Sequence, residues 1–159
     1  MISIRQNVFE TNSSSTHSMA IPQEVIKVPK YINFYLGEYG WETGRPNPAS
    51  YLWTAICYNY PENIAKYRKK LSEICDRYKI GRDYQMPEYD ENGYMKYGYI
   101  DHGYELNSFI DMLFEDDDKL TKFIFSGLVF TGNDNCDEDR EYINRKKEFV
   151  NYDWYFKGN

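Results

Sequence analysis

Residues 62–79 read ENIAKYRKKLSEICDRYK, and this stretch carries the clearest helical pattern in the sequence. Its apolar residues recur every three or four positions, which places them on one face of a helix. These residues are Ile64, Tyr67, Leu71, Ile74, Cys75 and Tyr78. Lysines and arginines occupy the rest of the circumference, and Gly81 is expected to end the helix. The stretch therefore predicts an amphipathic helix whose apolar stripe faces a core.

Further helices are predicted on both sides of this stretch. Asn47 and Pro48 have the residue types of an N-cap and a first helical position. Downstream, Asn107 is expected to cap a short helix. The acidic run 115–118 is expected to open another, since acidic residues favour helix N-termini. A last helix is predicted over 137–149.

Strand patterns occur before, between and after the predicted helices. Strands are predicted over residues 2–9, 31–36 and 125–131. Two shorter pieces, 84–86 and 95–100, flank Asn92 and Gly93, the residue pair of a tight hairpin turn. The sequence therefore predicts an α+β fold, with a mixed α/β arrangement also compatible. We expect a single domain over residues 1–159, with amphipathic helices packed on a mainly antiparallel or mixed sheet.

Composition limits the class of protein. The 159 residues are 42% hydrophobic and 18% aromatic, which excludes a low-complexity or largely disordered chain. A net charge of −6 argues against a nucleic-acid coat protein, so direct nucleic-acid binding is not expected. No apolar run approaches the roughly 20 residues of a membrane-spanning helix. The first residues lack a signal-peptide pattern, so we expect no membrane association and a cytoplasmic location.

The cysteines indicate free thiols. Cys57, Cys75 and Cys136 form no C-x-x-C pair and no Cys/His tetrad, so no structural zinc site is predicted. An odd number of cysteines without a signal peptide suits the reducing cytosol. No sequence pattern identifies a cofactor.

Residues 5–18, RQNVFETNSSSTHS, contain a run of small polar residues that is expected to form a tight loop over 10–18. The segment resembles a signature at the start of uncharacterised small proteins of Firmicutes and their phages. GEYGWE at 37–42 and GYIDH at 98–102 are similar to that group as well. The resemblance implies no activity, but it implies a bacterial host cell as the setting. It draws attention to Arg5, Asn7, Glu10, Asn12, Ser13, Ser14, Ser15 and His17.

The same segment has the residue types of an anion-binding or catalytic site. Hydroxyls and backbone amides that turn toward one point bind phosphate well. The candidate ligand-binding residues are Arg5, Asn7, Glu10, Asn12, Ser13, Ser14, Ser15 and Thr16. His17 is suited to proton transfer near neutral pH, with Glu10 or Asp101 holding its tautomer. The alternative is structural, because Asn and Ser runs also build turns that satisfy their own backbone, and Arg5 and Glu10 also suit a structural ion pair.

The second histidine, His102, follows a predicted strand, at a position where functional loops are common. We expect the 10–17 loop and the 101–102 loop to line one pocket. The candidate catalytic residues are His17, Asp101 and His102. Such a cluster suits an acid/base pair or a divalent metal, although no metal-ligand pattern is found. Residues 133–135 either join this site or form a simple turn.

The charged surfaces allow two interpretations. The basic face of 62–79 is best explained as a solvated helix surface, because its tyrosines share the apolar stripe. The acidic clusters at 111–118 and 134–141 suit a basic partner, although acidic helix starts explain much of them.

Two functional hypotheses follow. The first is a small intracellular ligand-binding protein that acts on a nucleotide or another phosphorylated small molecule through the N-terminal loop. Whether it is an enzyme stays open. The alternative is a non-catalytic, phage-type inhibitor or binding protein that acts on a host or defence protein. It would use an acidic, tyrosine-rich surface, since tyrosine is a favoured interface residue. The partner is therefore either a small phosphorylated ligand or a basic protein.

Overall fold

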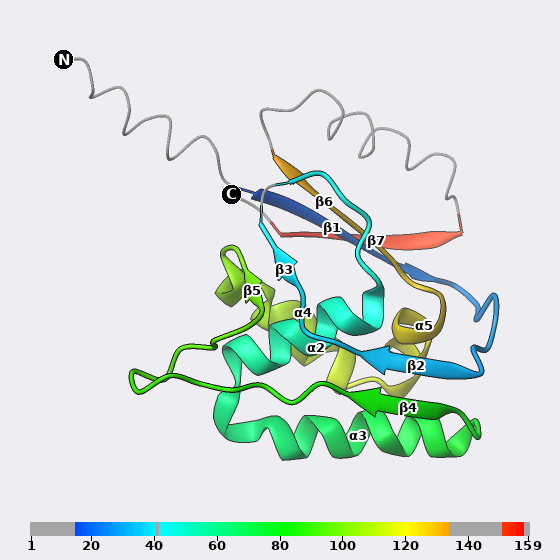
Figure 1. Cartoon of the computed structure of the whole chain (residues 1–159). Coiled ribbons are helices and arrows are strands. Elements are labelled where there is room, and N and C mark those ends of the chain that lie inside the picture. The colour runs from blue at the N-terminus through cyan, green and yellow to red at the C-terminus, as the bar shows by residue number, and fades with distance from the viewer. Residues whose placement is uncertain (1–14, 41, 134–150, 158–159) are drawn as a thin grey trace.

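The computed structural model describes residues 15–40, 42–133 and 151–157, and these form an α+β fold, which confirms that prediction (Figure 1). The helices are α2 (Pro48–Asn59), η1 (Pro61–Asn63), α3 (Ile64–Arg77), η2 (Gly103–Leu106), α4 (Asn107–Phe114) and α5 (Asp117–Ser126), with η denoting a 3-10 helix. The strands are β1 (Ser15–Pro22), β2 (Tyr31–Phe34), β3 (Glu38–Tyr39), β4 (Gly81–Tyr84), β5 (Tyr99–Ile100), β6 (Leu128–Asn133) and β7 (Tyr152–Lys157). Among the described residues the strands form the sheets β6-β1-β7, β2-β4 and β3-β5.

The stretch with the strongest helical pattern forms η1 and α3, and α3 is the longest helix in the described part of the chain. Leu71 and Ile74 in the middle of its stripe are 0% exposed. Most of the stripe therefore faces the core as predicted, but Tyr78 at its end is 41% exposed.

The end of α3 differs from the prediction. The helix does not continue to Gly81, because Lys79 adopts a left-handed conformation with φ 56°. The amides of Lys79 and Ile80 donate to the carbonyls of Asp76 and Cys75, which is the hydrogen-bond pattern of a Schellman cap. A lysine thus occupies the position that glycine usually takes.

Side-chain caps set the starts of two other helices. Asn47 caps α2 as predicted, since its side-chain oxygen accepts a hydrogen bond from the Ser50 amide at 3.1 Å. Asp116 caps α5 by accepting from two amides of the first turn. Asn107 does not cap α4. It is the first residue of that helix, and its side chain accepts from Asn59 instead.

The largest sheet has β1 in the centre, antiparallel to both β6 and β7. The predicted strand 2–9 lies outside the described residues. The loop predicted over 10–18 is wrong for Ser15–Ser18, which lies in β1 because two neighbouring strands satisfy its backbone. The strand predicted over 125–131 begins only at Leu128, since the preceding residues complete α5.

Strand β7 was not predicted, although its sequence YDWYFK has the two-residue period of a strand with one aromatic face. Trp154 of this strand stacks on Phe130 of β6, with ring centroids 5.8 Å apart. β7 pairs with β1, and its Trp154 ring packs across the sheet on β6. The helix predicted over 137–149 lies outside the described residues.

The predicted hairpin is formed only at its tip. Gly93 has φ 87° and donates to the carbonyl of Asp90, and Tyr89 and Met95 form an antiparallel bridge. The flanking strands do not pair with each other. β4 instead pairs with β2, and β5 pairs with β3, both in parallel. The sheets are therefore mixed in direction.

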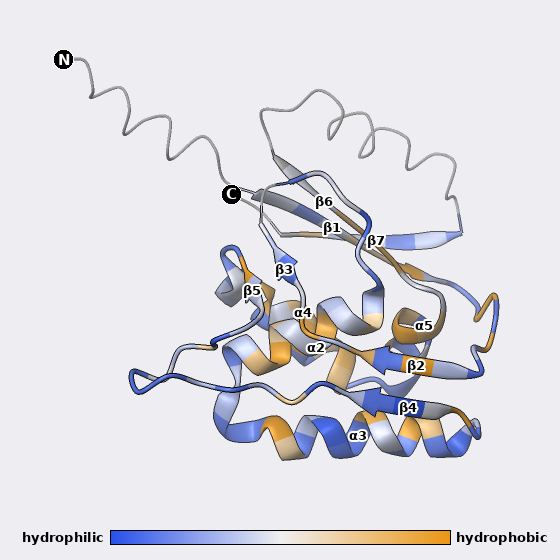
Figure 2. Ribbon diagram, in the orientation of Figure 1, coloured by the Kyte–Doolittle hydropathy of each residue, from blue (hydrophilic) through white to orange (hydrophobic). Residues whose placement is uncertain are grey.

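Helix α2 forms the centre of the core. Its residues Ala49–Cys57 are all buried. Figure 1 shows α2 between the β6-β1-β7 sheet and the layer formed by β2, β4 and α3. Figure 2 shows apolar residues concentrated in α2, α4 and α5. In the described part of the chain no helix combines the length and the apolar character needed to cross a membrane.

Two thiols belong to this core. Cys57 and Cys75 are buried and free, as predicted. Burial raises the pKa of Cys57 to about 12 and also raises the pKa of Cys75. Cys136 lies outside the described residues. The two buried thiols therefore act as small apolar side chains.

Candidate functional site

The N-terminal motif is only partly described by the structure. Arg5, Asn7, Glu10, Asn12, Ser13 and Ser14 lie outside the described residues. Ser15, Thr16 and His17 lie in β1, where Ser15 and His17 are buried. These three residues therefore belong to a strand of the main sheet rather than to a ligand-binding loop.

The side chain of His17, a residue of β1, is buried in the core and is 1% exposed. Its Nδ1 atom is 2.6 Å from the hydroxyl of Tyr51 on α2, and its Nε2 atom is 3.4 Å from the carbonyl oxygen of Gly40. When Nε2 carries the proton and donates to Gly40, Nδ1 accepts from Tyr51. Burial raises the pKa of Tyr51 well above its ordinary value, so this hydroxyl keeps its proton. The geometry favours a structural role for His17, and its catalytic role stays a prediction.

Asp101 and His102 form a partly exposed corner after β5. Asp101 accepts hydrogen bonds from the Tyr99 hydroxyl at 3.0 Å and from the Ser15 amide at 3.4 Å. His102 adopts φ 52°, and its Nε2 and Nδ1 atoms lie 4.0 Å from Asp101 and 3.4 Å from Glu105. The structure thus brings Ser15, at the start of β1, to Asp101, and the pocket shared by the 10–17 and 101–102 loops stays a prediction. The two histidines, however, have different partners, and the His17 ring is enclosed in the core.

The carboxylate of Asp101 is held in its charged form. Burial raises its pKa, but hydrogen bonds from Ser15 and Tyr99 and the nearby His102 outweigh this effect, so the pKa lies below its ordinary value. Burial and the hydrogen bond to Asp101 raise the pKa of Tyr99 to about 12, which keeps its hydroxyl a donor. The corner therefore presents a fixed negative charge at neutral pH.

Residues 133–135 do not form a described turn at this corner. Asn133 is the last residue of β6 and pairs with Ser15 of β1, whereas Asp134 and Asn135 lie outside the described residues. Within the ranges that the structure describes, no group of three or more His, Cys, Asp and Glu residues could hold a metal ion.

Five tyrosines in or beside residues 86–105 are exposed, and two of them, Tyr99 and Tyr104, lie next to Asp101 and His102. We call the five the tyrosine surface: Tyr58 is 38% exposed, Tyr94 70%, Tyr97 59%, Tyr99 43% and Tyr104 67%. Tyr58 at the end of α2 contacts Tyr99 edge to face, with ring centroids 5.9 Å apart, and Tyr104 lies beside His102. The sequence predicted an acidic, tyrosine-rich surface for the alternative hypothesis but did not locate it on this segment, part of which was predicted as strands.

Helix α2 holds the segment that carries these tyrosines. Trp53 donates to the carbonyl of Gln85 at 2.8 Å, and Tyr89 donates to the carbonyl of Cys57 at 2.7 Å. Asn59 donates to the carbonyl of Gly103 at 2.7 Å. These bonds fix the segment to α2 near both of its ends, while Tyr94, Tyr97, Tyr99 and Tyr104 are exposed. Figure 1 shows this segment, in green, along one side of the molecule.

The tyrosine surface is acidic. Residues 86–105 contain five acidic residues and a single lysine, Lys96. The acidic residues are Glu88, Asp90, Glu91, Asp101 and Glu105. Glu88 and Glu91 are exposed, next to Tyr89 and the turn at Gly93. An exposed aromatic patch with carboxylates around it has the residue types of an interface for a basic partner.

Comparison with known proteins adds no assignment. No family model, no curated protein and no solved structure matches this chain. The resemblance of residues 5–18 to small proteins of Firmicutes and their phages therefore stays a prediction.

Proposed function

We propose that this chain is a non-catalytic binding protein that captures a basic protein partner through its tyrosine surface. One observation supports the proposal most strongly. Five tyrosines with exposures of 38–70% share a segment and its neighbouring helix end with five carboxylates. This arrangement places large contact groups and mainly negative charge on one segment of the chain and the adjoining end of α2.

Tyrosine suits such a role for a physical reason. Its ring offers a large contact area, and only two torsions are fixed when it is buried in an interface. The hydroxyl supplies a hydrogen bond at the polar edge. Surrounding carboxylates raise the association rate of a basic partner and disfavour acidic ones. The tyrosines therefore supply affinity, and Glu88, Glu91 and Asp101 supply selectivity by charge.

The small-ligand hypothesis has less support. It assigns proton transfer to His17, whose ring is buried and bonded to Tyr51. Of its anion-binding residues, those from Arg5 to Ser14 lie outside the described residues, and Ser15 and Thr16 lie in β1. The remaining predicted site residues, Asp101 and His102, are partly exposed, and they lie next to Tyr99 and Tyr104 of the tyrosine surface.

A titration with a basic peptide tests the proposal. A short peptide of arginine and leucine is added to the ¹⁵N-labelled protein, and backbone signals are followed by NMR. We expect the largest shifts within residues 86–105 and at Tyr58. The matched peptide with glutamate in place of arginine should cause no shifts.

Two pairs of charge-neutral variants test the specificity of this binding. Glu88→Gln with Glu91→Gln removes two charges from the tyrosine surface. The control is Glu24→Gln with Asp153→Asn, which removes two exposed charges elsewhere. We expect the first pair to weaken binding about tenfold, or 1.4 kcal/mol, and the control to have little effect. Equal weakening by both pairs would mean that only net charge matters, and the proposal would fail.

A further inference from the structure

A small cleft lies between α4 and strand β7, next to the tyrosine surface. Its volume is about 240 Å³. This volume is below the roughly 300–1,000 Å³ that is usual for small-molecule sites. The lining residues that determine its chemistry are Met19, Glu105, Ser108, Phe109, Met112 and Tyr155. The size of the cleft therefore suits one side chain of a partner better than a separate small ligand.

The interior of the cleft is apolar. Met19 of β1 and Phe109 of α4 are 1% and 7% exposed, so they form its deepest part. Phe109 packs on Tyr155 of β7 with ring centroids 5.4 Å apart, which fixes two walls of the cleft against each other. Met19 and Met112 both line the cleft, and methionine side chains adapt to irregular apolar shapes. An aliphatic side chain can therefore fill the cleft, whereas a charged group would lose its hydration there.

One side of the cleft carries carboxylates. Glu105 lines the cleft, and its Oε2 atom lies 3.4 Å from Nδ1 of His102. His102 lies beside Asp101, whose carboxylate stays charged. Glu105 also directly follows Tyr104, which is 67% exposed. The cleft is therefore continuous with the tyrosine surface, and carboxylates lie where the two meet.

We propose that the cleft receives a leucine side chain of the basic partner, while an adjacent arginine of that partner pairs with Glu105. This role of the cleft rests on the proposed function, since the leucine belongs to the same partner. Burial of the leucine methyl groups in an apolar site removes them from water and strengthens binding. The carboxylate attracts the neighbouring basic residue and disfavours an acidic one. The partner recognised is therefore a basic segment that also carries an exposed aliphatic side chain.

Calorimetric titration with two peptides tests the role of the cleft. One is the arginine–leucine peptide, and the other has alanine in place of every leucine and the same charge. The wild-type protein should bind the leucine peptide at least about tenfold more tightly. Equal affinities would overturn the proposal for the cleft and leave the tyrosine surface as the binding site. Failure of both peptides to bind would overturn the proposed function and the role of the cleft together.

A larger side chain beside the cleft locates the leucine. Ser108 lines the cleft and is exposed, so the ring of Ser108→Trp can occupy the cleft without disturbing the core. In this variant the preference for the leucine peptide should fall below about twofold, while binding of the alanine peptide should stay unchanged. The control is Ala65→Trp, at an exposed position of α3 outside the cleft, which should keep the wild-type preference. A leucine preference that persists in Ser108→Trp would overturn the proposal.

A measurement on the wild-type protein does not depend on a folded variant. The methionine methyl groups are labelled with ¹³C, and their NMR signals are followed during titration with each peptide. Met19 and Met112 line the cleft, so saturating leucine peptide should shift both signals, and saturating alanine peptide should leave them in place. Unchanged Met19 and Met112 signals in the leucine complex would show that the cleft stays empty, and the proposal would fail.

Discussion

The hydroxyl of Tyr51 lies 2.6 Å from Nδ1 of His17, and both side chains are 1% exposed. This bond joins the central helix α2 to the central strand β1 inside the core. His17, which the sequence marks as a catalytic candidate, thus connects two elements of the core.

Tyr51→Phe should therefore destabilise the fold. The change removes the hydroxyl that bonds to His17 while it keeps the ring, and a buried hydrogen bond lost in this way costs about 1–3 kcal/mol. Urea denaturation measures the loss. The control is Tyr104→Phe, whose side chain is 67% exposed and which should change the free energy of unfolding very little. A Tyr51→Phe protein as stable as the control would show that the bond is not structural.

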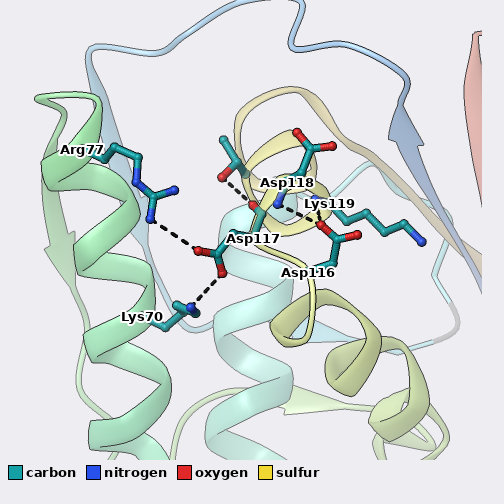
Figure 3. Close-up of polar contacts among 7 residues, drawn as sticks. Lys70, Arg77, Asp116, Asp117, Asp118 and Lys119 are labelled. Carbon is teal, nitrogen blue, oxygen red and sulfur yellow. Dashed lines mark hydrogen bonds and ion pairs between the residues drawn. The ribbon is translucent and has the colours of Figure 1, made fainter.

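The ion pairs in Figure 3 make stability depend on pH. Asp117 at the start of α5 lies 2.7 Å from Lys70 and 3.4 Å from Arg77 on α3. The hydrogen bond to Lys70, assisted by Arg77, outweighs desolvation and lowers the pKa of Asp117. Its contribution is complete above the unfolded-state pKa, about 3.9, and is lost as the pH falls through the lower folded-state pKa.

Asp117→Asn should accordingly lower stability at neutral pH. The side chain is 40% exposed, so solvent screening limits the loss to about 0.2–1 kcal/mol. The difference from wild type should shrink in strong acid and in high salt. Thermal unfolding of both proteins, measured from strong acid to neutral pH, tests the prediction. A difference in stability between variant and wild type that does not depend on pH would contradict it.

The left-handed residue at the end of α3 predicts a stabilising change. Lys79→Gly relieves the cost of φ 56° in an L-residue, and this gain exceeds the entropy that glycine loses. We expect a gain of about 0.5–1 kcal/mol. The same substitution at Lys69, inside the exposed part of the helix, should instead cost about 1 kcal/mol. Two changes of the same sign would mean that the Schellman cap does not control this terminus.

The buried thiols should be unreactive in the folded protein. Cys57 has a pKa raised to about 12 by burial, and Cys75 is also buried and raised. A Cys136→Ser protein should therefore react with a thiol reagent at mildly alkaline pH only after unfolding in urea, and then through both remaining thiols. Fast reaction of either thiol in the native protein would contradict the burial described for them.

Local features of the fold could be predicted from the sequence, whereas strand pairing could not. The cap at Asn47 and the apolar stripe around Leu71 depend on residues within one or two turns, so their signals are present in the sequence. The parallel pairing of β2 with β4 depends on long-range packing. One example is the stacking of Phe34 on Tyr84, with ring centroids 4.7 Å apart. A strong turn signal at Asn92 and Gly93 pointed instead to a local hairpin.

The candidate site shows the same limit. The residue types of the N-terminal motif predicted a catalytic role for His17. In the structure its ring is buried against Tyr51, which is 34 positions away in the sequence. The 10–17 and 101–102 loops were expected to lie together because each follows a strand-like segment in the sequence, and the contact between Ser15 and Asp101 joins these two segments. A tyrosine-rich surface was predicted, but its place on residues 86–105 was not. Which tyrosines are exposed depends on how this segment packs against α2, and residue type alone does not reveal that.

Calorimetric titration of tyrosine variants with the arginine–leucine peptide tests the proposed function most directly. Tyr97→Ser with Tyr104→Ser removes two rings from the tyrosine surface without changing its charge. Tyr31→Ser with Tyr35→Ser removes two rings that are 53% and 49% exposed elsewhere. We predict that the first pair weakens binding at least about tenfold and that the second pair leaves it within about twofold. Equal affinity of the first pair and wild type would contradict a binding role for the tyrosine surface.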